Sequence, residues 1–424
     1  MSITFNRDNL KGFIVKKDWD KIVPELKKAH QALEKKKGLF KKSLGWLHLP
    51  SQIPDSFLEE LQKLAREIQD HSEALLTIGI GGSYLGIRAA MDFLTDDHKL
   101  PVYYTGHHLS SDDLYRVLEN LKEKRVTVTV ISKSGTTTEP VLAFRVVKQF
   151  LKERYSQQQL KGRIICITDQ KRGALRQIAE KEGYRTFPIP DDVGGRFSVL
   201  TSAGLVPLAI AGVDIQGFIE GARKAESEYT VMDVDQNSAY QYAASRYLLY
   251  KKKKGIEVLS IFYPNLFYLG EWWKQLFAES EGKDGQGVFP SSLVFTTDLH
   301  SLGQFLQQGT RNIFETFLLI DKLQRPITIP RQEEDFDGFN CVADKDLDFV
   351  NKKAYEATAM AHFEGGVPNM TIQLCQADAL HLGHLFYFFE KAVAVSGCLL
   401  GINPFDQPGV EAYKKKMLRL LGKS

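Results

Sequence analysis

A hydroxyl-rich segment, Ser132–Pro140, has the composition of a phosphate-binding loop. It reads SKSGTTTEP, with five hydroxyl residues, one lysine and one glycine. Hydroxyls and backbone N–H groups at the start of a helix suit phosphate oxygens, because the helix N-terminus favours negative charge. A helix cap alone needs only about one or two hydroxyls. The order GxxxxGK[ST] of a nucleotide P-loop does not occur here, so we expect a phosphate ligand other than ATP or GTP.

A glycine cluster, Gly79–Gly86, is the second candidate for anion binding. It reads GIGGSYLG and follows an apolar run. Its backbone can approach an anion closely at a helix N-terminus. The spacing is not a dinucleotide fingerprint, and no acidic residue follows a second strand about 20 residues later. A tight turn with close helix packing is the alternative interpretation.

Arg196 is a candidate for stabilising an oxyanion. It lies in Asp191–Ser198, which reads DDVGGRFS. The two glycines permit a close backbone approach, and the guanidinium offers forked donors with a fixed charge. The alternative is a surface arginine that pairs with Asp191 or Asp192.

Glu279 is a candidate base near the end of a predicted helix, Leu266–Ser280. The apolar residues of this helix are spaced 3, 4 and 3 apart and define a buried face: Leu266, Leu269, Trp273 and Leu276. Glu279 stands one turn after Gln275, at the edge of that face, with Gly282 as a plausible C-cap. Burial and the helix dipole both disfavour an anion there, so the carboxylate should be a stronger base than an exposed one. The alternative is an exposed glutamate at a frayed helix end.

His300 and Lys414 are further acid/base candidates. His300 follows a predicted strand, although a lone histidine is more often structural. Lys414 lies in a last helix, for which Asp406 reads as the cap and Pro408 falls in the first turn. The alternative for Lys414 is a basic amphipathic tail.

The histidine pairs predict no metal site. His107 and His108 fall in a loop, and His381 and His384 have no cysteine or carboxylate partner in the pattern. We therefore expect no metal ion at these histidines.

The elements that position these residues alternate between strand and helix. In the first series, the predicted strands are Ala74–Ile80, Pro101–Tyr104, Arg125–Ile131, Arg163–Thr168 and Arg185–Ile189. In the second series they are Ile256–Phe262, Ser292–Thr296, Glu315–Ile320 and Asn369–Leu374. Such alternation predicts parallel sheets with helices on both faces, and ligands bind beyond the carboxyl ends of the strands.

Four segments divide the chain on this interpretation. Residues 1–70 read mostly as helix, with helical periodicity through Trp19–Lys37 and Phe57–Ile68. Residues 71–214 form a first α/β domain, residues 215–400 a second α/β domain, and residues 401–424 a helical tail. The charged stretch Ala222–Lys254 is predicted to be helical, with Lys251–Lys254 as a solvated helix end rather than a nucleic-acid site.

Composition excludes several classes of protein. The 424 residues include 43% hydrophobic and 25% charged residues, which is close to the globular average. The net charge of +3 and the lack of a basic block argue against nucleic-acid binding. No apolar run is long enough to span a membrane, and the N-terminus does not read as a signal peptide. Four scattered cysteines without CxxC spacing fit a reducing compartment, so we expect a cytoplasmic protein.

Taken together, these loops resemble the phosphoglucose isomerase (glucose-6-phosphate isomerase) family, in its shorter bacterial form. The resemblance covers most of the chain from about Gly79 onward, in the order of the family. Its most specific segments read DVGGRFSVLTSAG from Asp192 and GCLLGINPFDQPGVEAYK from Gly397; ESEGK from Glu279 and DLHSLGQ from Asp298 support it. It departs where His107-His108 replaces asparagine-rich sequence and where the phosphate loop reads Ser134-Gly135.

The resemblance implies two stacked flavodoxin-like domains of the sugar-isomerase type, which work as a homodimer. It implies aldose–ketose isomerisation of glucose 6-phosphate to fructose 6-phosphate through a cis-enediolate, in glycolysis and gluconeogenesis, with no metal and no organic cofactor. Glu279 would then move the proton between C2 and C1, beside Arg196. His300 from the partner subunit and Lys414 would open the sugar ring. The implied substrate-binding residues are Gly82, Ser83, Ser132, Lys133, Ser134, Thr137, Gln275 and Gln407, with Glu139 in support.

Two rival functions stay open on the sequence. An isomerase of the same fold could act on another sugar phosphate, such as mannose 6-phosphate. A non-catalytic sugar-phosphate sensor could keep the hydroxyl loop, but it would have no need of Glu279, Arg196, His300 and Lys414 together. The sequence therefore favours the isomerase.

Overall fold

The first sheet consists of five parallel strands in the computed structural model, which describes residues 3–35, 42–94, 98–323 and 325–422. The strands are β2 (Ala74–Ile78), β3 (Val102–Thr105), β4 (Val126–Ile131), β5 (Ile164–Thr168) and β6 (Arg185–Pro188). Their order is β3-β2-β4-β5-β6. The chain thus starts inside the sheet and builds outward in both directions. A crevice opens where the direction reverses, beyond the carboxyl ends of β2 and β4.

Helices cover both faces of this sheet. One face packs against α5 (Ser111–Leu121), α6 (Thr138–Lys152), α7 (Gln157–Arg163) and α8 (Ala174–Glu182) in a separate core cluster. The other face packs against α9 (Ser202–Ala211), which in turn contacts α3 (Asp55–His71) and α4 (Leu85–Phe93). All ten residues of α9 are buried, because it lies between the sheet and these helices.

The second sheet has four parallel strands and one antiparallel edge strand. The strands are β7 (Ile256–Ile261), β8 (Phe289–Val294), β9 (Ile313–Lys322), β10 (Asn369–Gln376) and the edge strand β1 (Ile3–Asn6), in the order β1-β10-β9-β7-β8. Its helices are α10 (Ile215–Tyr229), α11 (Ser238–Lys251), α12 (Phe267–Glu281), α13 (Gly303–Gln308), α14 (Leu347–Glu364) and α15 (Ala379–Leu400). The sequence analysis predicted these parallel strands correctly.

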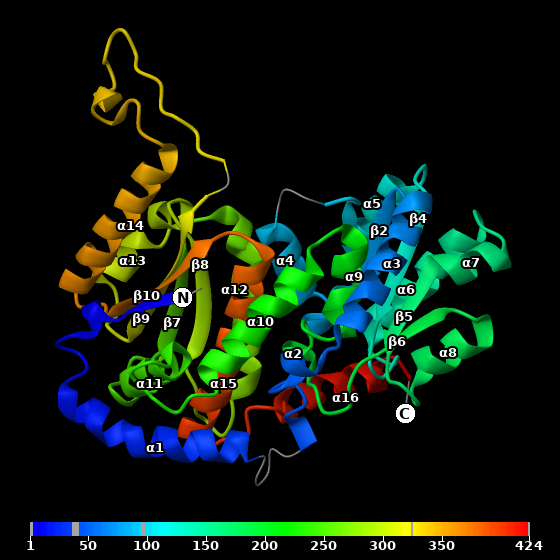
Figure 1. Cartoon of the computed structure of the whole chain (residues 1–424), viewed down its shortest axis with the longest axis horizontal. Coiled ribbons are helices and arrows are strands. Elements are labelled where there is room, and N and C mark those ends of the chain that lie inside the picture. Colours follow the sequence, from blue (N-terminus) through cyan, green and yellow to red (C-terminus); the bar gives the residue numbers. More distant parts are fainter. Residues whose placement is uncertain (1–2, 36–41, 95–97, 324, 423–424) are drawn as a thin grey trace.

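Helix α15 is the centre of the core between the two sheets (Figure 1). It packs against α10, α11 and α12, and also contacts α1 (Lys16–Glu34). A helix that is apolar on nearly all sides must be buried on all sides. Burial of α15 fixes α12 at the junction of the two halves, where α12 also packs against α4.

The N-terminal segment differs from its prediction. Besides α1, α3 and the short α2 (Leu49–Gln52), it supplies β1, whose residue Ile3 pairs with Leu374 of β10. Four residues are too few to show a clear alternating pattern, so the strand was not predicted. The end of the predicted helix at Lys36 and Lys37, residues 1 and 2 of the N-terminal segment, and residues 423 and 424 of the predicted tail lie outside the described residues.

The lysine run at the end of α11 is only partly solvated. Lys254 is buried, and its ammonium donates to the backbone oxygens of Arg311 (2.6 Å) and Gly366 (3.3 Å). The prediction of a fully solvated helix end was therefore wrong for this residue. The lysine instead joins the loops before β9 and β10.

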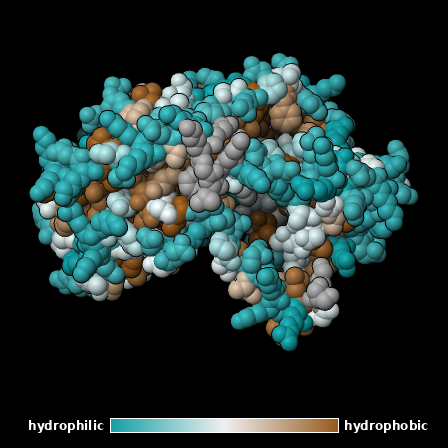
Figure 2. All heavy atoms as spheres, turned by 90° about the horizontal axis from the view of Figure 1, so that it is seen from below, coloured by the Kyte–Doolittle hydropathy of each residue, from teal (hydrophilic) through white to brown (hydrophobic). Residues whose placement is uncertain are grey.

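The face in Figure 2 is mostly hydrophilic, with hydrophobic side chains in scattered patches. Among the described residues, no helix has both the length and the apolar character to cross a membrane.

Candidate active site

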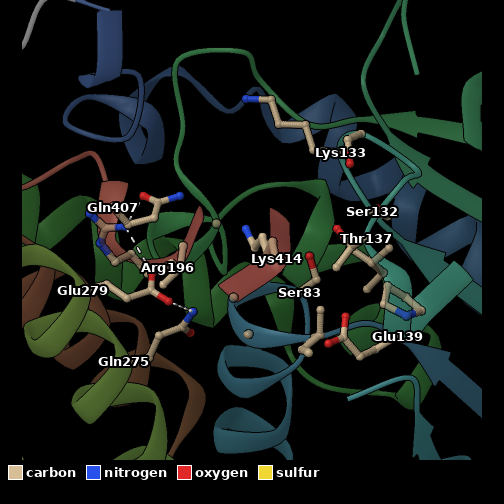
Figure 3. A pocket seen from close by; sticks show the side chains of 18 of the residues that line it. Ser83, Ser132, Lys133, Thr137, Glu139, Arg196, Gln275, Glu279, Gln407 and Lys414 are labelled. Atoms are coloured by element: carbon tan, nitrogen blue, oxygen red, sulfur yellow. Dashed lines mark hydrogen bonds and ion pairs between the residues drawn. The ribbon is translucent and has the colours of Figure 1, made fainter. Parts of the chain in front are cut away.

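The loops that the sequence analysis singled out converge on one cavity of about 750 Å³. It lies where the loops after β2, β4 and β5 meet the end of α12 and the C-terminal segment (Figure 3). Almost every predicted site residue lines it: Gly82, Ser83, Ser132, Lys133, Ser134, Thr137, Glu139, Arg196, Gln275, Glu279, Gln407 and Lys414. His300 does not.

The loop between β4 and α6 presents hydroxyls at a helix N-terminus. Ser132 accepts the N–H of Gly135 (3.0 Å), and Ser134 accepts the N–H of Thr136 (3.2 Å). These bonds curl the loop, and Gly135 takes a left-handed φ of +66° that favours glycine. Thr137 is the N-cap of α6, but its hydroxyl makes no capping bond. The hydroxyl hydrogens and the first N–H groups of α6 can therefore bind a phosphate dianion.

Gly82 allows the loop after β2 to touch the loop that carries Arg196. A Cβ at this position would lie 1.9 Å from the backbone oxygen of Gly195. Only glycine permits this approach, which brings Ser83 to the wall of the cavity opposite Arg196. The glycine cluster thus allows close packing, which was the alternative interpretation of this motif, and it leaves Ser83 on the cavity wall.

The Lys133 side chain turns away from the centre of the cavity (Figure 3). Its ammonium donates to the backbone oxygens of Pro190 (3.0 Å) and Asp191 (2.8 Å), and the backbone oxygen of Val193 lies at 3.5 Å. It thereby joins the hydroxyl loop to the segment that leads to Arg196. A phosphate contact from this residue would have to come from its backbone N–H.

Arg196 is buried, with 2% of its surface exposed. Its Nε donates to the Ser280 hydroxyl (2.8 Å), its Nη1 to Gln407 (2.9 Å) and Glu279 (3.2 Å), and its Nη2 to the backbone oxygens of Pro404 (2.6 Å) and Asp406 (3.2 Å). These five bonds fix the plane of the guanidinium. Burial lowers the pKa of Arg196, while Glu279 opposes that shift. The alternative of a surface arginine is wrong.

The Glu279 carboxylate is held at both oxygens on the cavity wall. Oε2 faces Arg196, and Oε1 accepts the amide N–H of Gln275 at 3.1 Å. Gln275 lies one turn earlier on α12, as the spacing predicted. The Glu279 side chain is 30% exposed, toward the cavity, so the alternative of a frayed surface glutamate is wrong. A carboxylate that is fixed but accessible can accept a proton from a bound ligand.

Lys283 ties the C-terminal segment to the end of α12. Its ammonium contacts the backbone oxygens of Ser280 and Asn403, and it lies 3.0 Å from an Asp406 carboxylate oxygen. Burial lowers the pKa of Lys283, and Asp406 opposes that shift. Sequence reasoning missed this contact, and its prediction of Asp406 as a helix cap was wrong. Val410 is the N-cap of α16 (Glu411–Leu420).

Lys414 and His300 occupy different surroundings. Lys414 lines the cavity from α16, where its ammonium lies 2.9 Å from Glu411. His300 ends a short 3-10 helix, Thr297–His300, after β8 and is exposed. The structure therefore brings Lys414 into the site of its own chain and leaves His300 outside it.

Arg172 is a cavity residue that the sequence analysis overlooked. It lines the cavity from the loop between β5 and α8, where its guanidinium pairs with Asp191 at 3.4 Å. The N–H groups of Lys171 and Arg172 both donate to Asp169, and they lower the pKa of that carboxyl. The sequence could have indicated Arg172 as a site residue, because its loop follows a predicted parallel strand as the other site loops do.

One group of metal-ligand residue types lies outside the cavity lining. Among the described residues, His107, His108 and Asp113 form a group whose ligand atoms lie within 4.8 Å of one another. The backbone N–H of Ser110 donates to His108 Nδ1 (3.3 Å), so Nε2 carries the proton that faces Asp113 at 3.0 Å. A metal-bound histidine usually donates its second N–H instead. The contacts fit a histidine–aspartate hydrogen bond better than a metal site.

Comparison with known families gives a match over most of the chain. The model of the phosphoglucose isomerase family matches residues 66–423. A curated relative, glucose-6-phosphate isomerase of Alkaliphilus metalliredigens, is 48% identical over 431 aligned residues, which cover 99% of this chain and 96% of the relative.

Solved structures agree on the fold. A hypothetical protein from Thermus thermophilus is 28% identical, with a TM-score of 0.89 and 99% coverage of both chains. A glucose-6-phosphate isomerase from Chlamydia trachomatis is 18% identical, with a TM-score of 0.85 and coverage of 99% of this chain and 88% of that one. At the second identity, the similarity supports the fold alone.

Proposed function

Because the chain belongs to the phosphoglucose isomerase family, we propose that the residues around this cavity carry out the family's aldose–ketose isomerisation. The chain interconverts glucose 6-phosphate and fructose 6-phosphate, a step of glycolysis and gluconeogenesis. The observation that carries the assignment of roles is Glu279, a carboxylate fixed at both oxygens against a buried arginine and open to the cavity.

The phosphate binds to the loop between β4 and α6. The hydroxyls of Ser132, Ser134 and Thr137, with that of Ser83 from the loop after β2, donate to its oxygens, and the N-terminus of α6 adds a favourable dipole. Lys133 contributes its backbone N–H, while its ammonium holds the neighbouring loop. Glu139, in the first turn of α6, supports this side of the cavity.

Glu279 is the base that transfers the proton between C2 and C1. The carboxylate takes the C2 proton, the C2–H electrons form the C1–C2 double bond, and the C1=O pair moves onto O1, which gives a cis-enediolate. A proton then passes from O2 to O1, the C2=O bond forms, and the C1–C2 electrons take the proton of the Glu279 carboxyl at C1. Arg196 supplies positive charge beside the developing oxyanion, while Gln275 and Gln407 keep both groups in place. The five bonds of Arg196 are already made within the protein, so it acts mainly as a fixed charge.

Ring opening precedes this step. The anomeric hydroxyl must lose a proton and the ring oxygen must gain one, which needs an acid/base pair. Lys414 supplies one group from α16. His300 lies outside the cavity of its own chain, which supports the proposal that it serves the site of a partner subunit.

The proposed assembly is a homodimer, and the proposed location is the cytoplasm. His300 is exposed, and so are two nearby apolar side chains, Leu302 (44%) and Phe305 (49%). Exposed apolar side chains beside an acid/base residue suit an interface that completes a site. The four scattered cysteines, which show no CxxC spacing, fit a reducing compartment. We also propose residues 71–214 and 215–400 as the two α/β domains, with residues 1–70 packed on the core and residues 401–424 as the tail.

The assignment is tested with Glu279→Gln. The variant should lose most turnover, because an amide cannot accept the C2 proton, while it keeps its affinity for a non-reacting sugar phosphate. Glu271→Gln is the matched control, since Glu271 lies on the same helix and pairs with Lys274. Comparable loss of binding and turnover in Glu279→Gln would mean that Glu279 is structural.

A further inference from the structure

A buried group of charges surrounds the end of α12 on the side away from the cavity. It consists of Arg246 on α11, Glu257 on β7 and Glu281, the last residue of α12, and all three side chains are fully buried. Arg246 Nε donates to Glu257, and Arg246 Nη1 donates to Glu281 and to the Ser396 hydroxyl (3.1 Å).

Burying these three charged side chains costs desolvation free energy. It holds two carboxylates and one guanidinium, and among the described residues Glu281 Oε2 has no hydrogen-bond partner. Burial alone would lower the pKa of Arg246, but the two carboxylates outweigh it and raise that pKa. Well-packed apolar side chains often stabilise a core as well as a buried ion pair does. A contribution to stability therefore does not by itself explain why charged rather than apolar side chains occupy this part of the core.

The position of Glu281 suggests a different reason. Glu279, Ser280 and Glu281 are consecutive, so their side chains leave α12 in different directions. Glu279 and Ser280 both contact Arg196 on the cavity side. Glu281 contacts Arg246 on the core side. The last turn of α12 is thus held between two buried arginines, whereas helix ends ordinarily fray.

We propose that Arg246 and Glu281 are positioning residues that fix the last turn of α12 and thereby place the Glu279 carboxylate for proton transfer. This inference rests on the proposed role of Glu279. Neither residue lines the cavity, so they act through the backbone of the helix. An error of about 1 Å at a reacting group can cost roughly 100-fold in rate. Fixing the position of the Glu279 carboxylate can therefore justify the free energy that is needed to bury Arg246 and its two carboxylate partners.

Glu281→Met is the main test. It leaves Arg246 paired with Glu257 and Ser396, and Glu257 keeps its bonds from Tyr242 (2.7 Å) and Thr316 (2.6 Å). One cation then faces one anion, so the fold should survive. We expect kcat to fall at least about tenfold with KM nearly unchanged. The isotope effect on kcat with glucose 6-phosphate deuterated at C2 should rise, because proton transfer becomes slower relative to the other steps.

Glu281→Gln is the rescue variant, and Glu271→Met is the control on the same helix. The glutamine oxygen can still accept from Arg246, so Glu281→Gln should restore most of the turnover lost in Glu281→Met. Native kcat in Glu281→Met would overturn the proposal. So would equal impairment of Glu281→Met and Glu281→Gln, or a loss of kcat that is matched by Glu271→Met.

Two further variants keep the test decisive. If Glu281→Met does not fold, Arg246→Lys replaces it, because one ammonium cannot span both carboxylates as a guanidinium does. Reduced kcat in a folded Arg246→Lys supports the proposal, and native kcat overturns it. Glu279→Gln is measured alongside. Native turnover in that variant would refute the proposed role of Glu279, whereas loss of turnover there with native turnover in Glu281→Met would refute only the positioning role of Arg246 and Glu281.

Discussion

Arg196 Nη1 and Glu279 Oε2 lie 3.2 Å apart, with the arginine buried and the glutamate partly open to the cavity. The cation cannot move, because four other protein atoms accept its hydrogen bonds. The anion can reach a ligand. This asymmetry suits a reaction in which the base exchanges a proton and the charge beside it stays constant.

Replacing Arg196 with lysine should lower kcat roughly 100- to 1000-fold, as the loss of an oxyanion-stabilising donor does in other enzymes. Lysine has fewer donors and cannot serve Glu279, Ser280 and Gln407 together. The thermal midpoint should fall as well, since a buried oxygen left unsatisfied costs about 1–3 kcal/mol. Steady-state kinetics and thermal unfolding measure both effects. Arg176→Lys is the control, because Arg176 pairs with Glu180 on α8 and does not line the cavity. Native kcat in Arg196→Lys would refute the role of Arg196.

Lys133→Met should raise KM more than it lowers kcat, and it should also lower the thermal midpoint of the unliganded protein. The reason is that the ammonium joins the hydroxyl loop to the backbone oxygens of Pro190 and Asp191. Thermal unfolding with and without a sugar phosphate separates this role from direct binding. An unchanged midpoint without ligand, with weaker ligand binding, would show that the ammonium binds phosphate directly.

The sequence predicted the site loops but not all of their contacts. Position after a strand indicated the hydroxyl loop, the adjacent glycines indicated Arg196, and helical spacing indicated Glu279 as a candidate. The resemblance to the family then favoured these residues over their alternatives. The roles of Lys133 and Asp406 could not be predicted, since each depends on backbone oxygens that approach only in the folded chain. Arg246 and Glu281 are 35 residues apart, and no local pattern marks a buried ion pair.

In the fold too, local sequence patterns predicted the elements but not the contacts between segments that are distant in sequence. Alternating apolar runs predicted the parallel strands of both sheets. The strand β1 and the burial of Lys254 escaped prediction, because both depend on partners far along the chain. Periodicity reports which face of an element is apolar, and it does not report which distant segment covers that face.

Mixing two inactive variants should restore activity if His300 serves the partner's site. In a heterodimer of Glu279→Gln and His300→Ala, one site carries both changes and the other carries neither. Unfolding and refolding an equal mixture should therefore recover up to about one quarter of native activity, because about half of the dimers are mixed and each has one intact site. A mixture no more active than its parents would place His300 in the site of its own chain.

Acidification should weaken the fold through His107. Burial, with a smaller effect of His108, lowers the pKa of His107 to about 4 from an ordinary value of 6.5. Between these values the unfolded chain binds more protons than the folded chain, so stability falls as the pH drops from 6.5 toward 4. His107→Phe keeps an aromatic ring on Tyr84, against which His107 stacks at 4.3 Å, and removes the titration.

Thermal midpoints at pH 7.5 and pH 5 test this prediction. The native chain should lose more stability on acidification than His107→Phe does. Equal losses would show that another group dominates the acid response.

Isomerisation of glucose 6-phosphate in D₂O tests the central claim most directly. If Glu279 carries the proton between C2 and C1, part of the proton should exchange with solvent while it resides on the carboxylate. Deuterium should then appear at C1 of fructose 6-phosphate with the native chain, and Glu279→Gln should bind the substrate without promoting exchange. Turnover and exchange at the native rate in Glu279→Gln would contradict the account.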